Sequence, residues 1–191
     1  MKKLVFFASG SGSNFQAVID AIENNEIDAV ITGLITDNEY AGAIRRAENH
    51  NICVSIINNF GADEAAEELL SVLKGWTPDL IILAGFLKKI PDEITRLYQN
   101  RIINIHPSLL PKYGGKGFYG NHVHKAVLEA GDKSSGCTVH YVNENYDEGK
   151  IIKQKTVDVL PDDTPETLAA RVLAEEHNLL PSVIRQLLNQ K

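Results

Sequence analysis

Short apolar runs alternate with amphipathic segments along the first hundred residues. The runs rich in Val, Ile and Leu, which predict strands, lie at 4–8, 29–36, 53–57, 79–84 and 102–105. Between them, spacings of three and four residues, as in Phe15, Val18 and Ile22, predict helices with one buried face. Strands that are apolar on both faces are typical of parallel sheets covered by helices, so this half predicts an α/β fold with a mostly parallel, Rossmann-like sheet.

The pattern changes after residue 134. Two strand-like segments, Gly136 to Asn143 and Lys150 to Val159, follow each other directly and are joined by the turn-rich stretch "NENYDEG". Consecutive strands joined by a turn predict an antiparallel pair at the C-terminal side of the sheet.

A long helical pattern closes the chain, in the stretch that begins "DDTPETLAARVLAEEHNLL". Thr164 is the expected N-cap and Pro165 the expected first helical residue, because proline at that position loses no helical hydrogen bond. The pattern runs to Leu188, and we expect a break near Pro181.

Length and charge limit the classes of function. The 191 residues suit one domain, and a net charge of -6 with scattered Lys and Arg argues against a nucleic-acid surface. No stretch approaches the roughly 18 apolar residues of a membrane span. Cys53 and Cys137 have no metal-ligand spacing, so we expect two buried thiols in a reducing, cytoplasmic environment.

The stretch "SGSGSNFQ", Ser9 to Gln16, directly follows the first predicted strand. Gly10 and Gly12 allow a tight turn, and Ser13 and Gln16 have the spacing of a capping box. A helix N-terminus after such a loop offers free N–H groups, which suits a phosphate, although a plain strand-to-helix turn has the same pattern.

A dinucleotide site is the alternative use of this loop. That fingerprint needs a third glycine where this chain has Phe15, although Asp37 ends the second strand where a ribose-binding acid would lie. A small phosphate ester fits better, and a nicotinamide cofactor is the minority interpretation.

The stretch "NIHPSLLPKY", 104–113, places an amide and an imidazole at the end of a strand. Alternate residues of a strand share a face, so Asn104 and His106 point one way and Ile103 and Ile105 the other. Parallel sheets bind ligands at this carboxyl edge, where an Asn and a His could bind an oxyanion and supply a proton. A capping Asn and a structural His explain the spacing equally well.

Other polar residues are less informative. Asp147 lies in a turn, where Asn145 and Glu148 are rivals for any role. His122 and His124 lack the partners of a zinc site, so they suggest helix-start or loop-binding roles. We expect His140, inside a strand, to be packed or solvent-facing.

Taken together and in order, six motifs resemble the phosphoribosylglycinamide formyltransferase family. They are "GSGSN", "AGFLKKI", "NIHPSLLPKY", "GCTVHYV", the D-x-G at Asp147 and "AARVLAEEH". The resemblance implies a single formyltransferase domain over 1–191, with a phosphate-binding half at 1–100 and a catalytic and folate-binding half at 101–191. It implies formyl transfer from 10-formyltetrahydrofolate to glycinamide ribonucleotide in purine synthesis, without a metal, nucleic acid or membrane, and leaves a homodimer open.

The resemblance also assigns site residues. The catalytic trio it implies is Asn104, His106 and Asp147, with Asn104 and a protonated His106 on the oxyanion and Asp147 favouring that protonated form. The implied contacts of glycinamide ribonucleotide are Gly12, Ser13, Asn14, Leu173, Ala174, Glu175 and Glu176. Those of the folate are Leu87, Lys88, Lys89, Ile90, Asn104, Asn143, Glu144, Asn145, Tyr146 and Asp147.

The chain departs from the family pattern in three places. The Gly114–Gly120 segment is longer than in the best-known members, so its contacts are undefined. Lys88 stands where an Arg is often found, which keeps a main-chain contact but removes bidentate chemistry. The stretch "NFGADEA" lacks the Arg with which some members hold the folate tail.

Three other functions compete. Formyltetrahydrofolate hydrolase shares the trio but carries an N-terminal regulatory domain, which we do not expect before Leu4. Methionyl-tRNA formyltransferase continues differently after "SLLP" and adds a C-terminal barrel. A non-catalytic nucleotide- or sugar-phosphate-binding module would use the glycine loop without requiring the trio.

Overall fold

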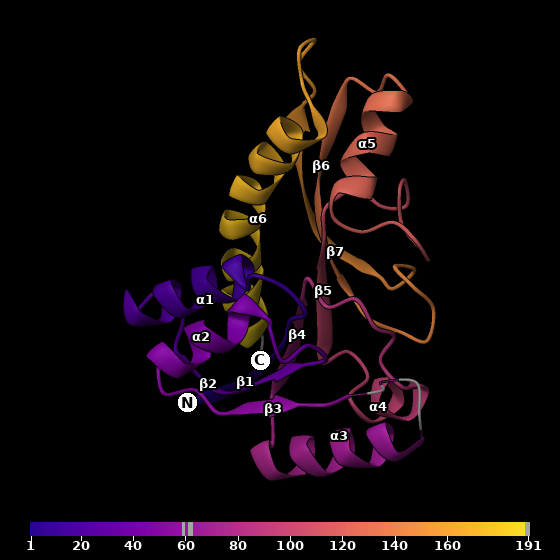
Figure 1. Ribbon diagram of the computed structural model, residues 1–191. Helices are drawn as coiled ribbons and strands as arrows, with labels where there is room; N and C mark the ends of the chain where they lie inside the picture. Colours follow the sequence, from indigo (N-terminus) through magenta and orange to yellow (C-terminus); the bar gives the residue numbers. More distant parts are fainter. Residues whose placement is uncertain (59, 61–62, 190–191) are drawn as a thin grey trace.

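The computed structural model describes residues 1–58, 60 and 63–189 (Figure 1). Thirteen elements follow one another along the chain: β1 (Lys2–Phe7), α1 (Ser13–Glu23), β2 (Ala29–Thr36), α2 (Gly42–Asn49), β3 (Val54–Ile56), α3 (Asp63–Trp76), β4 (Leu80–Ala84), α4 (Asp92–Leu97), β5 (Ile102–His106), α5 (Asn121–Glu129), β6 (Ser134–Tyr141), β7 (Ile151–Asp158) and α6 (Pro165–Leu188). The predicted strands all form, within two residues of their predicted bounds.

A seven-stranded sheet runs in the order β3-β2-β1-β4-β5-β6-β7. The first five strands pair in parallel, whereas β5 pairs with β6 and β6 with β7 in antiparallel fashion. The predicted fold class and the predicted antiparallel pair are therefore confirmed. The strand order reverses between the parallel neighbours β1 and β4, because β2 and β3 lie to one side of β1 and the later strands lie to the other. Such a switch point leaves a crevice at the carboxyl ends of the two strands.

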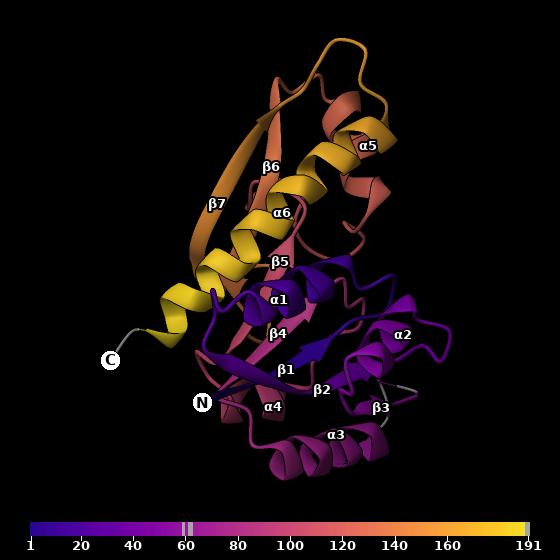
Figure 2. The ribbon, with the colours of Figure 1, turned by 90° about the vertical axis from the view of Figure 1, so that its left-hand side faces the viewer.

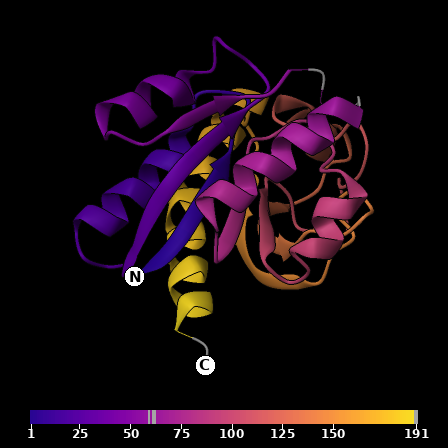
Figure 3. The same cartoon turned by 90° about the horizontal axis from the view of Figure 1, so that it is seen from below.

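Helices cover both faces of the sheet because the strand residues alternate between two cores. One core takes Leu4 and Phe6 from β1 and packs them under α1, α2, α5 and α6. The other takes Val5 and Phe7 and packs them under α3 and α4. Figure 2 shows α6 crossing the sheet beside α1, and Figure 3 shows α3 and α4 on the opposite side.

Helix α6 begins as predicted and does not break. The Thr164 side chain accepts from the Thr167 N–H, and Pro165 occupies the first turn. The helix continues through Pro181 to Leu188, so the expected break is wrong. Proline removes one helical hydrogen bond, but buried neighbours such as Leu180 and Val183 hold this stretch against the sheet.

One cysteine differs from expectation. Cys137 is fully buried in β6, where burial is the main cause that raises its pKa to about 12. Cys53 is exposed, because it precedes β3 at the edge of the sheet. Among the described residues, no helix is long and apolar enough to cross a membrane.

The contact between Gly33 of β2 and Trp76 of α3 allows a test of the fold. A Cβ atom on Gly33 would lie 2.2 Å from the Trp76 ring, so we expect Gly33→Ala to lower the free energy of unfolding by about 1–3 kcal/mol. Urea denaturation measures the change, and adding Trp76→Leu should recover part of it.

Gly75 provides the matched control, one residue before Trp76. Its Cβ position meets open space among the described residues, so Gly75→Ala should be neutral or stabilise by up to about 1 kcal/mol. Equal losses in both variants would contradict the packing argument.

Candidate active site

A cleft of about 780 Å³ opens at the carboxyl ends of β1, β4 and β5. Most of its wall comes from four loops and from helix α6, so the cleft joins residues that are far apart in the chain. These are the loop after β1, the loop after β4, the glycine-rich segment before α5, the turn after β6, and α6. The cleft therefore begins at the crevice between β1 and β4 and continues to the antiparallel strands β5 and β6.

The loop after β1 leads directly into α1. Gly12 is the N-cap with φ 72°, and a Cβ atom there would lie 2.7 Å from that of Ala43. The predicted capping box is wrong, because helix α1 already starts at Ser13 and the Gln16 amide donates instead to Asp20. Gln16 makes the first helical hydrogen bond, to Gly12, so the N–H groups before it point out of the helix toward the cleft.

Asn14 and Glu176 join this helix start to α6. The Asn14 Nδ2 donates to Glu176 Oε2 at 2.6 Å, and both side chains are buried at the cleft wall. Burial raises the pKa of Glu176 to about 7, although the hydrogen bond from Asn14 acts in the opposite direction. A carboxyl with this pKa can bind either as a neutral donor or as a charged acceptor near neutral pH.

Not every residue expected at the substrate lines the cleft. Gly12, Ser13, Asn14, Leu173 and Glu176 do. Ala174 is exposed on another face of α6, and Glu175 lies 3.9 Å from Lys155, so the structure does not bring these two to the site.

The folate residues divide in the same way. Those that line the cleft are Leu87, Lys88, Lys89, Ile90, Asn104, Asn143, Asn145, Tyr146 and Asp147. Glu144 instead pairs with Arg96 at 3.5 Å. The Lys88 ammonium lies 3.9 Å from Asp37, and in the "NFGADEA" stretch residues 59, 61 and 62 lie outside the described residues.

The glycine-rich segment forms one wall. Gly115 and Gly117 have φ of 91° and 97°, values that favour glycine, and both line the cleft. The Gly115 N–H donates to Asp147 Oδ2 at 2.9 Å. The segment therefore contacts Asp147 directly, a contact that the sequence left undefined.

Asn104, His106 and Asp147 converge at the base of the cleft. The Asn104 amide nitrogen lies 3.5 Å from Asp147 Oδ1, and His106 Nδ1 lies 3.6 Å from Asp147 Oδ2. Ile103 and Ile105 pack in the core under α6, so the predicted alternation of faces is confirmed. Asp147 has φ 55°, a left-handed conformation that aspartate tolerates in turns.

His140 belongs to this group and was missed. It pairs across the β5–β6 ladder with Asn104, is 2% exposed, and its Nε2 lies 3.2 Å from the Asn104 amide nitrogen and 3.5 Å from Asp147 Oδ1. Strand alternation showed that the His140 side chain points to one face of the sheet, but not which one. Only the register of β5 against β6 shows that this face is the cleft.

The hydrogen bonds fix which nitrogens of the two histidines carry protons. His106 Nε2 lies 2.8 Å from the Tyr113 carbonyl, and His140 Nδ1 lies 2.8 Å from the Tyr141 carbonyl. A carbonyl only accepts, so each of these nitrogens carries its proton. In the neutral rings, His106 Nδ1 and His140 Nε2 are therefore the free acceptors.

Burial controls the protonation of the group. It lowers the pKa of His106 more than Asp147 and the Tyr113 carbonyl raise it, so the free site holds a neutral imidazole at neutral pH. Asp147 raises the pKa of His106, which is the direction expected of a residue that favours the protonated form. Burial would also raise the pKa of Asp147, but donors around the carboxylate, among them the Gly115 N–H, hold this pKa below its usual value.

A third histidine lies nearby. His124 of α5 lines the cleft and is 3% exposed, whereas His122 is exposed on the same helix. Burial and the neighbouring His106 lower the pKa of His124. Among the described residues, no cluster of three or more His, Cys, Asp or Glu is arranged to hold a metal ion.

The raised pKa of Glu176 predicts a pH-dependent stability. Between its ordinary pKa of 4.5 and its folded pKa of about 7, the folded state holds a proton that the unfolded state has lost. The free energy of unfolding should therefore fall as the pH rises through this window, by on the order of 3 kcal/mol. Glu176→Gln should remove this dependence and raise the melting temperature at pH 8.

Glu175→Gln is the matched control, because this neighbouring carboxylate is only partly buried. It should keep the wild-type dependence in denaturation curves from pH 5 to 8. A Glu176→Gln variant that still loses stability across this window would contradict the assignment.

Comparison with known proteins agrees with this geometry. The model of the family described as formyl transferase matches residues 2–184. The phosphoribosylglycinamide formyltransferase, chloroplastic, of Vigna unguiculata is 43% identical over 194 residues, covering 100% of this chain and 62% of its own length. The phosphoribosylglycinamide formyltransferase of Bacillus subtilis is 39% identical, covering 98% of this chain and 95% of its own length.

A solved structure shows the same fold. Glycinamide ribonucleotide transformylase 1 from Geobacillus kaustophilus superposes with a TM-score of 0.91 at 38% identity, covering 99% of this chain and 100% of the other. This chain spans less than two thirds of the length of the Vigna unguiculata relative, at 62%. The matched family model and the identities over nearly the whole chain show that the protein belongs to the formyl transferase family.

Proposed function

We propose that the protein transfers the formyl group of 10-formyltetrahydrofolate to the amine of 5-phosphoribosylglycinamide, a step of purine biosynthesis. The observation that carries the proposal is the convergence of Asn104, His106 and Asp147 in a cleft that also holds the start of α1. Family membership and the names of the relatives supply the reaction class.

The cleft suits both substrates. The N–H groups at the start of α1 suit the phosphate, and Glu176 lies between them and the catalytic group, where a ribose or an amine can reach it. The flat folate ring suits the slot between the 87–90 loop and the 143–147 turn, whose walls include Ile90 and Val142. The formyl carbon then lies near Asn104 and His106.

The chemistry follows from the protonation states. The neutral amine attacks the formyl carbon, the carbonyl π electrons move to oxygen, and the Asn104 N–H groups donate to the resulting oxyanion. One such donor is worth roughly 3 to 4 kcal/mol of barrier. The bond between the formyl carbon and the folate N10 breaks when the oxyanion collapses.

His106 and Asp147 carry the proton in this scheme. The substrate nitrogen becomes positively charged when it bonds to the formyl carbon, and neutral His106 then accepts a proton from it at Nδ1 and passes this proton to the leaving N10. The charged Asp147, 3.6 Å from Nδ1, stabilises the imidazolium that exists between these steps. A neutral resting His106 is the form this role requires.

Two competing functions would each need only part of the residues in the cleft. A formyltetrahydrofolate hydrolase would need the trio and a water, but no phosphate-binding start of α1 and no buried Glu176. A non-catalytic sugar-phosphate module would need α1 but not the trio. The presence of both parts in one cleft favours transfer to a phosphorylated amine.

The predicted partners are small molecules, and a homodimer and a cytoplasmic location are part of the same proposal. Sedimentation of the purified protein tests the dimer. Neither property is needed for the chemistry above, because every residue it uses belongs to one chain.

Folate-dependent formylation of glycinamide ribonucleotide by the purified protein tests the function. Asn104→Ala should lower kcat by about 10² to 10³, and the double variant with His106→Ala should show no turnover above background. Folate release that is equally fast without the amine substrate would instead indicate a hydrolase.

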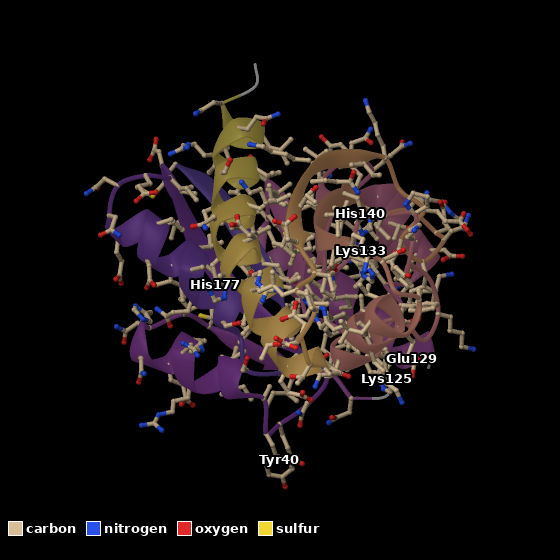
Figure 4. All side chains as sticks on the ribbon, turned by 90° about the horizontal axis from the view of Figure 1, so that it is seen from above. Tyr40, Lys125, Glu129, Lys133, His140 and His177 are labelled. Atoms are coloured by element: carbon tan, nitrogen blue, oxygen red, sulfur yellow. The ribbon has the colours of Figure 1, made fainter. Side chains whose placement is uncertain are left out.

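Lys125→Gln is the control for this assay. Lys125 lies beside Glu129 on the outer side of α5 (Figure 4), with a side chain that is 66% exposed. It should keep wild-type kcat, and absence of turnover in both the wild type and this variant would refute the proposal.

The pH dependence of kcat tests the proton carrier. Activity should fall as the pH drops through the pKa of His106, because protonation removes the acceptor. Asp147 raises that pKa, so Asp147→Asn should move the acid limb to lower pH and also reduce the maximal rate. An acid limb that stays in place in Asp147→Asn, or persists in His106→Asn, would exclude His106 as the base.

A further inference from the structure

The side of the His106 ring that faces away from Asp147 contacts Tyr113, a residue that does not line the cleft. Its Nε2 donates to the carbonyl of Tyr113 at 2.8 Å, and the intervening turn is closed by the Ser108 hydroxyl, which donates to the Lys112 carbonyl at 2.7 Å. The Tyr113 carbonyl therefore decides which nitrogen of His106 faces the reacting atoms.

The backbone of Tyr113 is in a conformation that needs support. Its φ is 54°, in the left-handed region that large side chains rarely adopt. A residue there keeps its conformation only when its surroundings hold it. The position of the carbonyl thus depends on what fixes the Tyr113 side chain.

Asp132 supplies that fixation. The Tyr113 hydroxyl donates to Asp132 Oδ2 at 3.0 Å, and the Lys112 ammonium lies at the same distance from this oxygen. Asp132 is itself placed by its main-chain N–H, which donates to the carbonyl of Val127 in α5. Asp132 lies outside the cleft lining, so it acts on His106 through its neighbours, and Tyr113 is the neighbour whose carbonyl contacts the ring.

We propose that Tyr113 and Asp132 form a positioning pair that holds His106 in the tautomer with its proton on Nε2 and so presents Nδ1 to the reacting nitrogen atoms. The inference rests on the proposed formyl transfer only for its effect on the rate. The predicted effect on the His106 tautomer can be observed whatever reaction the protein catalyses.

Loss of the hydroxyl releases the Tyr113 backbone from its left-handed conformation. The carbonyl then moves away from Nε2, and the ring populates both neutral tautomers. Only the molecules that keep a free Nδ1 are competent for proton transfer, so kcat falls while substrate binding is unchanged. The loss of one neutral hydrogen bond corresponds to a decrease of roughly three- to tenfold.

The first experiment reads the tautomer directly by ¹⁵N NMR of the histidine rings in the ligand-free protein. Wild-type His106 should show a protonated Nε2 and an unprotonated Nδ1 above its pKa. Tyr113→Phe, which keeps the ring, and Asp132→Ala should both show a mixture of tautomers. Asp132→Asn keeps an oxygen that accepts from the Tyr113 hydroxyl and should restore the wild-type pattern.

The second experiment measures kcat, KM and the pH profile in the same variants. Tyr113→Phe should lower kcat with little change in KM, and the acid limb should move to lower pH, because the Tyr113 contact raises the pKa of His106. The double variant with Asp132→Ala should be no worse than either single variant. Lys112→Gln removes the other partner of Asp132 and should stay within twofold of the wild type.

Wild-type tautomer populations in both Tyr113→Phe and Asp132→Ala would overturn the positioning pair. A loss of kcat in Lys112→Gln as large as in these two variants would also overturn it. Melting temperatures separate these outcomes from unfolding, and Asp132→Asn tests the pair if Tyr113→Phe does not fold. Failure of formyl transfer in the wild type would leave the NMR result standing, so the two hypotheses fail separately.

Discussion

The antiparallel ladder between β5 and β6 is the constraint on which the site depends. It sets Asn104 opposite His140 and His106 opposite Thr138, so that one face of the two strands carries Asn104, His106 and His140. The other face carries Ile103, Ile105 and Val139, which are buried under α6. A slip of one residue would turn both sets over, so burial of the core face also fixes the register of Asn104, His106 and His140.

Burial and the neighbouring polar groups shift the pKa values of His106 and Asp147 in opposite directions. Burial keeps His106 neutral, while Asp147 remains a carboxylate because the Gly115 N–H and the Asn104 amide donate to it. A buried charge without such partners would cost several kcal/mol. The site thus holds a base and an anion side by side in a place that excludes much of the solvent.

The sequence predicted the layers and the strand ends well, because hydrophobic alternation is set by burial along each strand separately. It missed His140 because the role of that residue depends on pairing with another strand. The predicted capping box does not form, because the N-cap of α1 is Gly12, which has a left-handed φ and no side chain to accept a hydrogen bond. The break at Pro181 failed because contacts with the sheet outweigh the loss of one helical hydrogen bond.

The resemblance to a family named more candidate site residues than the strand and loop patterns did, and the structure brings only part of them to the cleft. Residues next to a true cleft residue were carried over with it, as with Ala174 and Glu175 beside Glu176 and Glu144 beside Asn143. A helix turns by about 100° per residue and a turn changes direction at every residue, so neighbours in the chain face different surroundings. Only coordinates separate them.

The hydrogen bond between Asn14 and Glu176 joins groups 162 residues apart. Contacts of such long range form late in folding, since the chain between them must already be ordered. During synthesis the start of α1 emerges long before α6, which follows every strand in the sequence. A nascent chain that has completed its sheet therefore still lacks one wall of the cleft until α6 packs beside α1 and supplies Glu176.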